Sequence, residues 1–287
     1  MDCPICDTAL RRATPDWLHR CPACGFEAST LDCVPARIAS EEEHLDEAAR
    51  EAALRDLRQG NFRIVLDRAF GDAELAGLTL LEVGCGHGWF LDEAKRRGIV
   101  TFGIEPDAKI ARRSATYGAH RIRTGFFPEA LEDSERFDII VFNDVFEHLP
   151  DIRAALHAVE RHLNPGGRLV LNMPSRGGFF YRLARAFAAF GVQGPFDRMW
   201  QKGMPSPHLS YFTRDDARRL CGRYGLGEEH SFALPSLPFR RLWQRLRLSK
   251  SNPVPVDMAI WAGCALLIPF LRLLPPDITV QSFRRAA

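Results

Sequence analysis

The sequence predicts an α/β fold in which a doubly wound, mostly parallel sheet follows a small cysteine-rich module. Short apolar runs alternate with helical patterns between residues 79 and 172, and this alternation is typical of a parallel sheet. A glycine cluster follows the first apolar run, and four cysteines fall in two matched pairs near the N-terminus. The 287 residues, of which 46% are hydrophobic, suffice for one large domain with an appendage.

The two cysteine pairs predict a metal site. The motifs Cys-Pro-Ile-Cys and Cys-Pro-Ala-Cys are separated by fourteen residues, a spacing that matches a tetrahedral zinc ribbon. The N-terminus shows no secretory signal, so we expect a cytoplasmic protein rather than a disulfide framework. A redox pair is the alternative, and the absence of a thioredoxin-like strand pattern disfavours it. We therefore predict a zinc-ribbon-like module over residues 1–35, with structural zinc on Cys3, Cys6, Cys21 and Cys24.

Residues 36–75 are predicted as a helical linker, and residues 76–287 as the main domain with inserts near 174–212 and 236–276. In the linker, residues 40–59 fit a helix that Ser40 caps. The expected strands of the main domain are residues 79–83, 100–104, 137–142 and 168–172, with ITVQSF as the last strand. Its expected helices are residues 89–97, 108–117, 152–163 and 214–224.

Three glycines after the first strand predict a ligand-binding turn. In LEVGCGHGWFL, Gly84, Gly86 and Gly88 separate a strand from a helix, and bare backbone there lets a ligand lie against the helix N-terminus. A dinucleotide-binding loop needs a third small residue where this chain has Trp89, so a pyrophosphate fits poorly. A tight turn without a ligand is the alternative.

Two acidic residues near that turn indicate which ligand it holds. Glu82, at the end of the first strand, offers a carboxylate to a cationic amino group. Glu105, in GIEPD after the second strand, is placed to accept hydrogen bonds from two ribose hydroxyls. A ligand with a ribose and an amino-acid cation, but no phosphate, is S-adenosylmethionine.

The chain resembles the class I S-adenosylmethionine-dependent methyltransferases. The segments LLEVGCGHGWFL, FGIEPD, FDIIVFNDVFEHLPD and LNPGGRLVLNMPS occur in that family's order and spacing, over roughly residues 75–230 with a final strand near 278–284. The resemblance implies a Rossmann-like seven-stranded methyltransferase sheet, ribose binding by Glu105, and donor contacts from Asn143 and Asp144. The family often has an acid near the adenine where this chain has Phe126, so the resemblance implies a contact made by backbone and an aromatic ring.

The segment after the fourth strand offers candidate catalytic groups. In NDVFEHLPD, Asp144, Glu147 and His148 stand at i, i+3 and i+4, so a helical turn would place them on one face. Such a set suits a divalent metal, and His148 alone suits a general base. The alternative is local, with Asp144 capping the turn and His148 bonded to a neighbouring carbonyl.

His208 and Tyr211 in PSPHLSYFT are the other candidate catalytic residues, because the resemblance places this loop beside the acceptor pocket. A buried structural histidine is the alternative. Methyl transfer is an in-line displacement from a sulfonium, so proximity and orientation supply most of the rate. A base is needed only if the acceptor must lose a proton.

The charge distribution bears on the acceptor. Residues 176–287 hold 17 Lys and Arg against 7 Asp and Glu, whereas residues 1–35 have a net charge of −2. Nucleic-acid binding needs a basic face, so the cysteine module is expected to be a structural cap or a protein-contact module. Three alternatives stay open: an RNA methyltransferase with a zinc module, a sugar or other small-molecule C- or O-methyltransferase, and a zinc-stabilised scaffold without activity.

Apolar and cationic stretches in the C-terminal third favour an amphiphilic acceptor. FRRLWQRLRLSK holds five cations and no anion, and it leads into MAIWAGCALLIPFLRLL. The fourteen uncharged residues 258–271 are fewer than the about 20 that span a bilayer, so we expect a helix either buried on the sheet or lying in the membrane interface. Ubiquinone-pathway O-methyltransferases, which the catalytic core resembles, handle amphiphilic acceptors at a membrane. We therefore expect a small amphiphilic or lipid-linked acceptor and an anionic membrane surface as partners, with nucleic acid less favoured.

Overall fold

The computed structural model describes residues 1–33, 47–118, 121–236, 242–247 and 253–286. Its main sheet has seven strands in the order β10-β11-β8-β7-β4-β5-β6. Strand β11 runs antiparallel to both of its neighbours, and the other pairs are parallel. The predicted doubly wound, mostly parallel seven-stranded sheet is therefore confirmed. The strands are β4 (Thr79–Val83), β5 (Val100–Glu105), β6 (Arg121–Thr124), β7 (Phe137–Asn143), β8 (Leu163–Pro174), β10 (Leu226–Leu234) and β11 (Ile278–Arg285).

Two of these strands, β6 and β10, were not among the expected ones. They form the two edges of the sheet, and β6 has the sequence RIRT with no fully buried side chain. Edge strands bury fewer side chains than central ones, so they lack the apolar signal that predicts β4, β5, β7 and β8.

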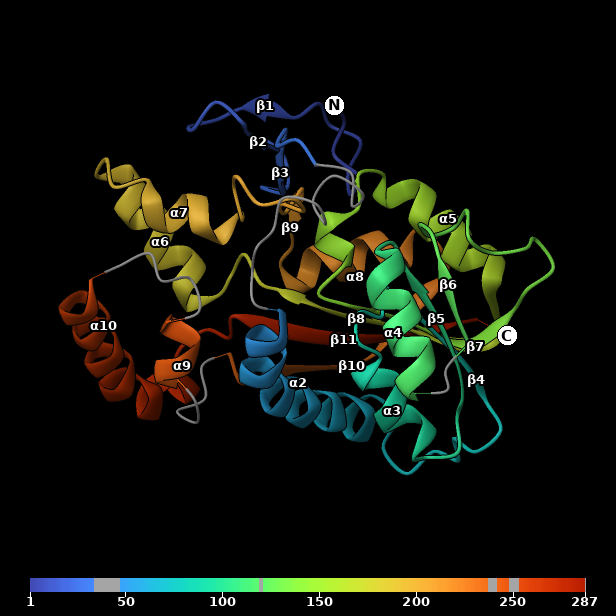
Figure 1. The fold of residues 1–287 in the computed structure, drawn as a ribbon. Helices are drawn as coiled ribbons and strands as arrows, with labels where there is room; N and C mark the ends of the chain where they lie inside the picture. Colours follow the sequence, from blue (N-terminus) through green and yellow to red (C-terminus); the bar gives the residue numbers. More distant parts are fainter. Residues whose placement is uncertain (34–46, 119–120, 237–241, 248–252, 287) are drawn as a thin grey trace.

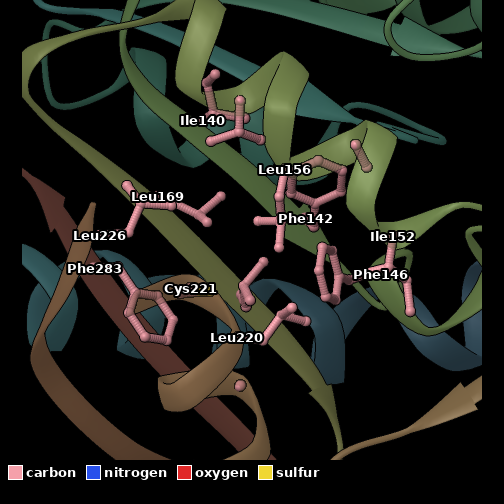
Figure 2. Packing of buried hydrophobic residues seen from close by; sticks show 14 of the residues in the cluster. Ile140, Phe142, Phe146, Ile152, Leu156, Leu169, Leu220, Cys221, Leu226 and Phe283 are labelled. Carbon is pink, nitrogen blue, oxygen red and sulfur yellow. The ribbon is translucent and has the colours of Figure 1, made fainter. Parts of the chain in front are cut away.

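Helices cover both faces of the sheet (Figure 1). They are α2 (Glu47–Phe70), α3 (Trp89–Lys95), α4 (Ala108–Gly118), α5 (Ile152–His162) and α8 (Arg214–Gly222). On one face, Phe142 of β7 packs with Leu156 of α5 and Leu220 of α8, as Figure 2 shows. On the other face, the residues of α2 and α3 form a second core with β4, β7 and β11.

Helix α2 occupies the described part of the segment that was predicted as a helical linker. It buries Val65, Leu66 and Ala69 in the core on the sheet, in one cluster with Phe90 of α3. The C-terminal part of α2, from Phe62 to Phe70, is therefore part of the main domain's core. The predicted start of this helix at Ser40 lies outside the described residues.

Two inserts interrupt the sheet. The first, between β8 and α8, contains α6 (Phe179–Ala189), α7 (Gly194–Met199) and β9 (Ser210–Tyr211). The second, between β10 and β11, contains α9 (Leu242–Arg247), α10 (Val254–Leu267) and the 3₁₀ segment η2 (Ile268–Leu273). Both inserts lie toward the same end of the molecule, at the left of Figure 1.

The N-terminal module is docked on the first insert. Its strands β1 (Arg11–Arg12), β2 (Leu18–Arg20) and β3 (Glu27–Ser29) form a four-stranded antiparallel sheet with β9, in the order β1-β2-β3-β9. Phe26 of the module stacks at a tilt on Phe212, with 5.3 Å between ring centroids. The module therefore shares its core with the main domain.

Candidate functional site

The glycine turn forms one wall of the candidate donor site. Gly84, Gly86 and Gly88 all have positive φ, at 67°, 50° and 72°, which is the left-handed region that glycine enters without strain. A Cβ atom on Gly84 would lie 2.6 Å from Cγ2 of Val145, so this glycine permits a close approach of two loops. A Cβ atom on Gly86 would have no heavy atom within 4 Å. The backbone of Gly86 therefore faces open space that a ligand can fill.

Glu105 ties that turn to the loop after β5. Its two carboxylate oxygens accept hydrogen bonds from the amides of Gly86, at 2.8 Å, and Asp107, at 2.9 Å. Burial raises the pKa of its carboxyl above the ordinary value. The amide of Gly125 donates to the Glu105 carbonyl at 3.2 Å, which brings the loop after β6 alongside. The next residue, Phe126, has a 61% exposed side chain that is free to meet a flat ring.

Glu82 has one buried carboxylate oxygen that no described residue bonds to. The Asn143 amide donates to its Oε1 at 2.8 Å, and the Asn172 amide donates in turn to Asn143 Oδ1 at 3.3 Å. The other carboxylate oxygen, Oε2, is buried and has no hydrogen-bond partner among the described residues. Burial raises the pKa of Glu82 to about 8. A buried carboxylate with one free oxygen fits a ligand that brings a cation.

Asp144 lies on the turn that follows β7. It has a positive φ of 54°, and its amide donates to the Asn172 carbonyl at 2.8 Å. Its carboxylate lies 3.7 Å from the guanidinium of Arg58 on α2. Arg58 is not predictable from the sequence as part of this candidate site, because only the packing of α2 over the sheet brings it beside Asp144.

The candidate set of Asp144, Glu147 and His148, which the sequence left open against a purely local role, is not the group that converges in the structure. The turn after β7 is a 3₁₀ segment, η1 (Phe146–His148), so the spacing of an α-helical face does not apply. The group that converges within 4.8 Å is instead Glu147, His148 and His208. Oε1 of Glu147 lies 4.0 Å from Nε2 of each imidazole. His208 joins the set because its loop folds back onto η1.

The environment of His148 gives it one free ring nitrogen. Its Nδ1 lies 2.9 Å from the carbonyl oxygen of Pro207, which can only accept, so Nδ1 carries the hydrogen and Nε2 the lone pair. This bond to a carbonyl is the local alternative that the sequence left open. Burial lowers the pKa of His148, which keeps the imidazole neutral near pH 7. The side chain therefore has the tautomer and the protonation state of a general base.

Family and structure comparisons agree with this geometry. A family model described as a methyltransferase domain matches residues 47–230. The chain belongs to this methyltransferase family. The methyltransferase is similar to a ubiquinone biosynthesis O-methyltransferase of Nitrobacter winogradskyi, at 28% identity over 59% of this chain and 64% of the relative. A second ubiquinone biosynthesis O-methyltransferase, from Azorhizobium caulinodans, is 31% identical over 43% of this chain and 53% of the relative.

The fold of the methyltransferase is also that of a solved enzyme. The phosphoethanolamine N-methyltransferase 2 of Haemonchus contortus, solved in complex with S-adenosyl-L-methionine, superposes with a TM-score of 0.58 at 14% identity. The match covers 91% of this chain and 62% of that one. The methyltransferase spans between half and two thirds of the length of the two curated relatives, so the match concerns the catalytic core rather than whole proteins.

A cavity of about 270 Å³ adjoins His208 of the methyltransferase. His208 and Tyr211 line it together with Tyr181 of α6 and Asp277 before β11. Burial lowers the pKa of His208 to about 3, so this imidazole is neutral. The Tyr211 hydroxyl donates to the Met199 carbonyl at 2.8 Å, and burial raises its pKa. Tyr211 is thus placed as a wall of the cavity, with its hydroxyl hydrogen already engaged.

The four N-terminal cysteines form a second candidate site. Their sulfur atoms all lie within 4.8 Å of one another, with 3.5 Å between Cys3 and Cys24 and 3.4 Å between Cys6 and Cys21. Zinc–sulfur bonds of about 2.3 Å in a tetrahedron put neighbouring sulfurs roughly 3.8 Å apart, so the observed set fits zinc. All four are free thiols in the described structure.

Proposed function

We propose that this protein transfers the methyl group of S-adenosylmethionine to a hydroxyl oxygen of an amphiphilic, lipid-linked acceptor. The observation that carries the donor assignment is the buried oxygen of Glu82 that has no partner among the described residues, together with the open space at Gly86 on the turn that follows the same strand. The amino group of the donor would pair with that oxygen, and its ribose would lie near Glu105. S-adenosylmethionine supplies an electrophilic methyl group on a sulfonium.

The acceptor hydroxyl would be activated by His148. Its Nε2 lone pair takes the hydroxyl proton while the new oxygen–carbon bond forms and the sulfur–carbon bond breaks, leaving S-adenosylhomocysteine. The Pro207 carbonyl fixes the ring through Nδ1. His208, with its ring centroid 4.7 Å from that of His148, closes the acceptor side. The named relatives are O-methyltransferases, and their chemistry supports a hydroxyl acceptor.

The cavity beside His208 supports an acceptor with an apolar tail. Its wall includes the N-terminal end of α6, which is tied to the chain that returns from η2: Phe179 donates its amide to the Pro275 carbonyl at 3.0 Å, and Phe180 donates to Asp277 at 2.7 Å. The two inserts therefore meet at the cavity. Both inserts also expose large apolar side chains. Among them are Phe187 and Phe190 at the C-terminal end of α6.

Helix α10 and η2 form an apolar surface that is largely exposed in the described structure, apart from the side of α10 that meets α9. The stretch Val254–Leu273 has 20 helical residues, and its most apolar 18-residue window has a mean hydropathy of 1.9 with only 6% of the window buried. The alternative of a helix buried on the sheet is therefore wrong. A helix that is apolar all round is normally buried in protein or lipid, so its exposure supports a lipid environment. Its most exposed side chains are Met258, Leu266, Phe270 and Leu273.

The connections of this helix favour the membrane interface over a crossing. Twenty helical residues, partly 3₁₀, reach roughly 30 Å, so the expectation that the segment is too short to span does not hold. However, Leu234 and Ile278 are paired neighbours in the sheet, so the insert leaves and returns at one point. A single crossing would force residues 235–253, with five cations and no anion, back through the bilayer. We infer that the helix lies in the interface with the cations on anionic head groups.

Vesicle binding tests this surface. Wild-type protein should co-sediment with vesicles of phosphatidylglycerol and phosphatidylethanolamine at low salt. The double variant Leu266→Asp, Leu273→Asp should stay in the supernatant, because both side chains are at least 75% exposed on the proposed lipid face. Val100→Asp, an exposed apolar position at the start of β5 and outside the two inserts, is the matched control and should sediment as wild type. Wild-type protein in the supernatant would contradict the membrane surface.

RNA is the second candidate acceptor, favoured by one observation. Residues 176–287 carry a net charge of +10, which suits a phosphate backbone as well as anionic lipid. The acidic cysteine module weighs against it. A sugar or other soluble acceptor is the outcome that remains if neither RNA nor lipid takes up the methyl group.

The cysteine cluster is proposed to hold one structural zinc ion on Cys3, Cys6, Cys21 and Cys24. Metal binding to such a site supplies folding free energy to a small module. Elemental analysis should find one zinc per chain. Unchanged metal content in Cys21→Ser would contradict the assignment.

A further inference from the structure

The cysteine module holds the loop that carries His208. Strand β3 pairs with β9, and the amide of Ser29 donates to the Leu209 carbonyl at 2.9 Å. The hydroxyl of Ser29 donates to the His208 carbonyl at 2.7 Å, and this bond is buried. One residue of the module thus fixes two consecutive carbonyls of the acceptor loop. Figure 1 shows β3 lying over β9.

The same loop is bound on its other side to the turn after β7. The amide of Leu209 donates to the Glu147 carbonyl at 2.8 Å, and the imidazoles of His148 and His208 pack edge to face. Leu209 therefore stands between the module and the proposed general base. A displacement of β3 would be passed to His208 through two hydrogen bonds.

Glu27 is a second link, from β3 to the wall of the acceptor cavity. Its carboxylate is fully buried, and it accepts hydrogen bonds from the Tyr181 hydroxyl at 2.5 Å and from Arg185 at 2.6 Å. Arg20 of the module lies 3.7 Å away. Tyr181 lines the cavity, so the module reaches the acceptor site at two places.

The turns between the cysteine ligands are themselves the docking points of the module. Arg153 donates to the Cys3 carbonyl at 2.8 Å, and Arg223 donates to the Ile5 carbonyl at 2.9 Å. Arg176 donates to the Gly25 carbonyl. The strands of the module have only two or three residues each, so a metal ion on the four cysteines would hold these turns in shape better than the small sheet alone.

We propose that the cysteine module forms part of the acceptor site, with Ser29 and Glu27 as positioning residues. A metal ion bound to the four cysteines would hold these two residues in place against His208 and Tyr181. The donor residues Glu82 and Glu105 lie on β4 and β5, and the hydrogen bonds described for them join them to Asn143, Gly86 and Asp107 of the main domain. Metal loss should therefore impair methyl transfer while leaving donor binding intact. This inference rests on the proposed function for its activity readout.

The test compares Ser29→Ala with Thr30→Ala. Ser29→Ala removes the hydroxyl that bonds to the His208 carbonyl, whereas the Thr30 hydroxyl bonds only to Trp17 inside the module. Both variants should bind one zinc and bind S-adenosylhomocysteine as wild type does. Ser29→Ala should speed hydrogen exchange of the Leu209 amide about fivefold, the effect of losing a typical buried hydrogen bond, and should lower methyl transfer to a bacterial lipid extract. Thr30→Ala should change neither.

Chelation of the wild-type protein gives the second arm. Removal of zinc should raise exchange at Leu209 and abolish methyl transfer, with S-adenosylhomocysteine affinity within twofold of the metal-bound protein. Parallel loss of donor affinity would overturn the proposal, because the metal would then hold the whole domain. Identical exchange at Leu209 in Ser29→Ala and Thr30→Ala would overturn it as well. Since exchange needs no acceptor, a wrong acceptor assignment leaves this test standing.

Discussion

Gly84 and Gly86 form a matched pair that separates stability from donor binding. Both have positive φ, so alanine at either position pays about 1–2 kcal/mol for the left-handed backbone. In Gly84→Ala the new Cβ also meets Cγ2 of Val145 at 2.6 Å, and relief of such a contact costs typically about 1–3 kcal/mol. We therefore expect a loss of about 2–5 kcal/mol in the free energy of unfolding for Gly84→Ala and about 1–2 kcal/mol for Gly86→Ala.

Donor affinity should follow a different order. The Cβ of Gly86→Ala projects into the open space that we assign to S-adenosylmethionine, so its affinity for S-adenosylhomocysteine should fall by roughly tenfold or more, as an added methyl in a filled site does. Urea denaturation measures the first quantity and titration calorimetry the second. Wild-type donor affinity in Gly86→Ala would refute the placement of the donor. Equal destabilisation of both variants would refute the Val145 contact.

Three further perturbations test single groups of the site. The pKa of Glu82 is about 8 in the folded protein against an ordinary 4.5, so its stabilising effect is complete below pH 4.5 and is lost as pH rises through 8. The ammonium group of the donor should displace the proton of the Glu82 carboxyl. Titration calorimetry at pH 7, in buffers of different ionisation enthalpy, should therefore show proton release on donor binding, and Glu82→Gln should abolish this release. Equal proton release in the variant would exclude Glu82 as the group that meets the ammonium. His148→Asn should lower the rate of methyl transfer about 10²-fold or more without changing donor affinity. The wild-type rate should fall only below about pH 6.5, because burial lowers the pKa of His148. A rate that already falls as the pH drops from above 7 would exclude His148 as the base. Arg176→Met should cost about 3–5 kcal/mol in denaturant unfolding, since it leaves the buried carboxylate of Asp216, 3.0 Å away, without its partner; a loss under about 1 kcal/mol would contradict the burial of this pair.

The donor half of the site is predictable from the sequence because its signals are local. The glycine turn comes directly after β4, and Glu82 and Glu105 stand at the ends of β4 and β5. Both strands have clear apolar runs, and the parallel sheet brings the ends of adjacent strands together. The cysteine spacing likewise predicts a metal cluster that the structure brings together.

The acceptor half is not predictable in this way, since it depends on pairs far apart in the chain. The Ser29 hydroxyl bonds to the His208 carbonyl across 179 positions, and neither segment contains a pattern that predicts this contact. The same limit applies to one contact of the donor half, because Arg58 reaches Asp144 only through the packing of α2 over the sheet. The convergence of Glu147 with two histidines depends on a 3₁₀ turn where an α-helical turn was expected.

The measurement that tests the central claim most directly is incorporation of label from S-adenosylmethionine, labelled at its methyl group, into a bacterial lipid extract and into total RNA. The protein should be assayed as the zinc-loaded full chain, with His148→Asn as the control. We expect label in the lipid fraction alone, dependent on His148 and retained on the lipid as a methyl ether. Label in RNA, or in neither fraction while S-adenosylhomocysteine still binds, would contradict a lipid-linked hydroxyl as the acceptor.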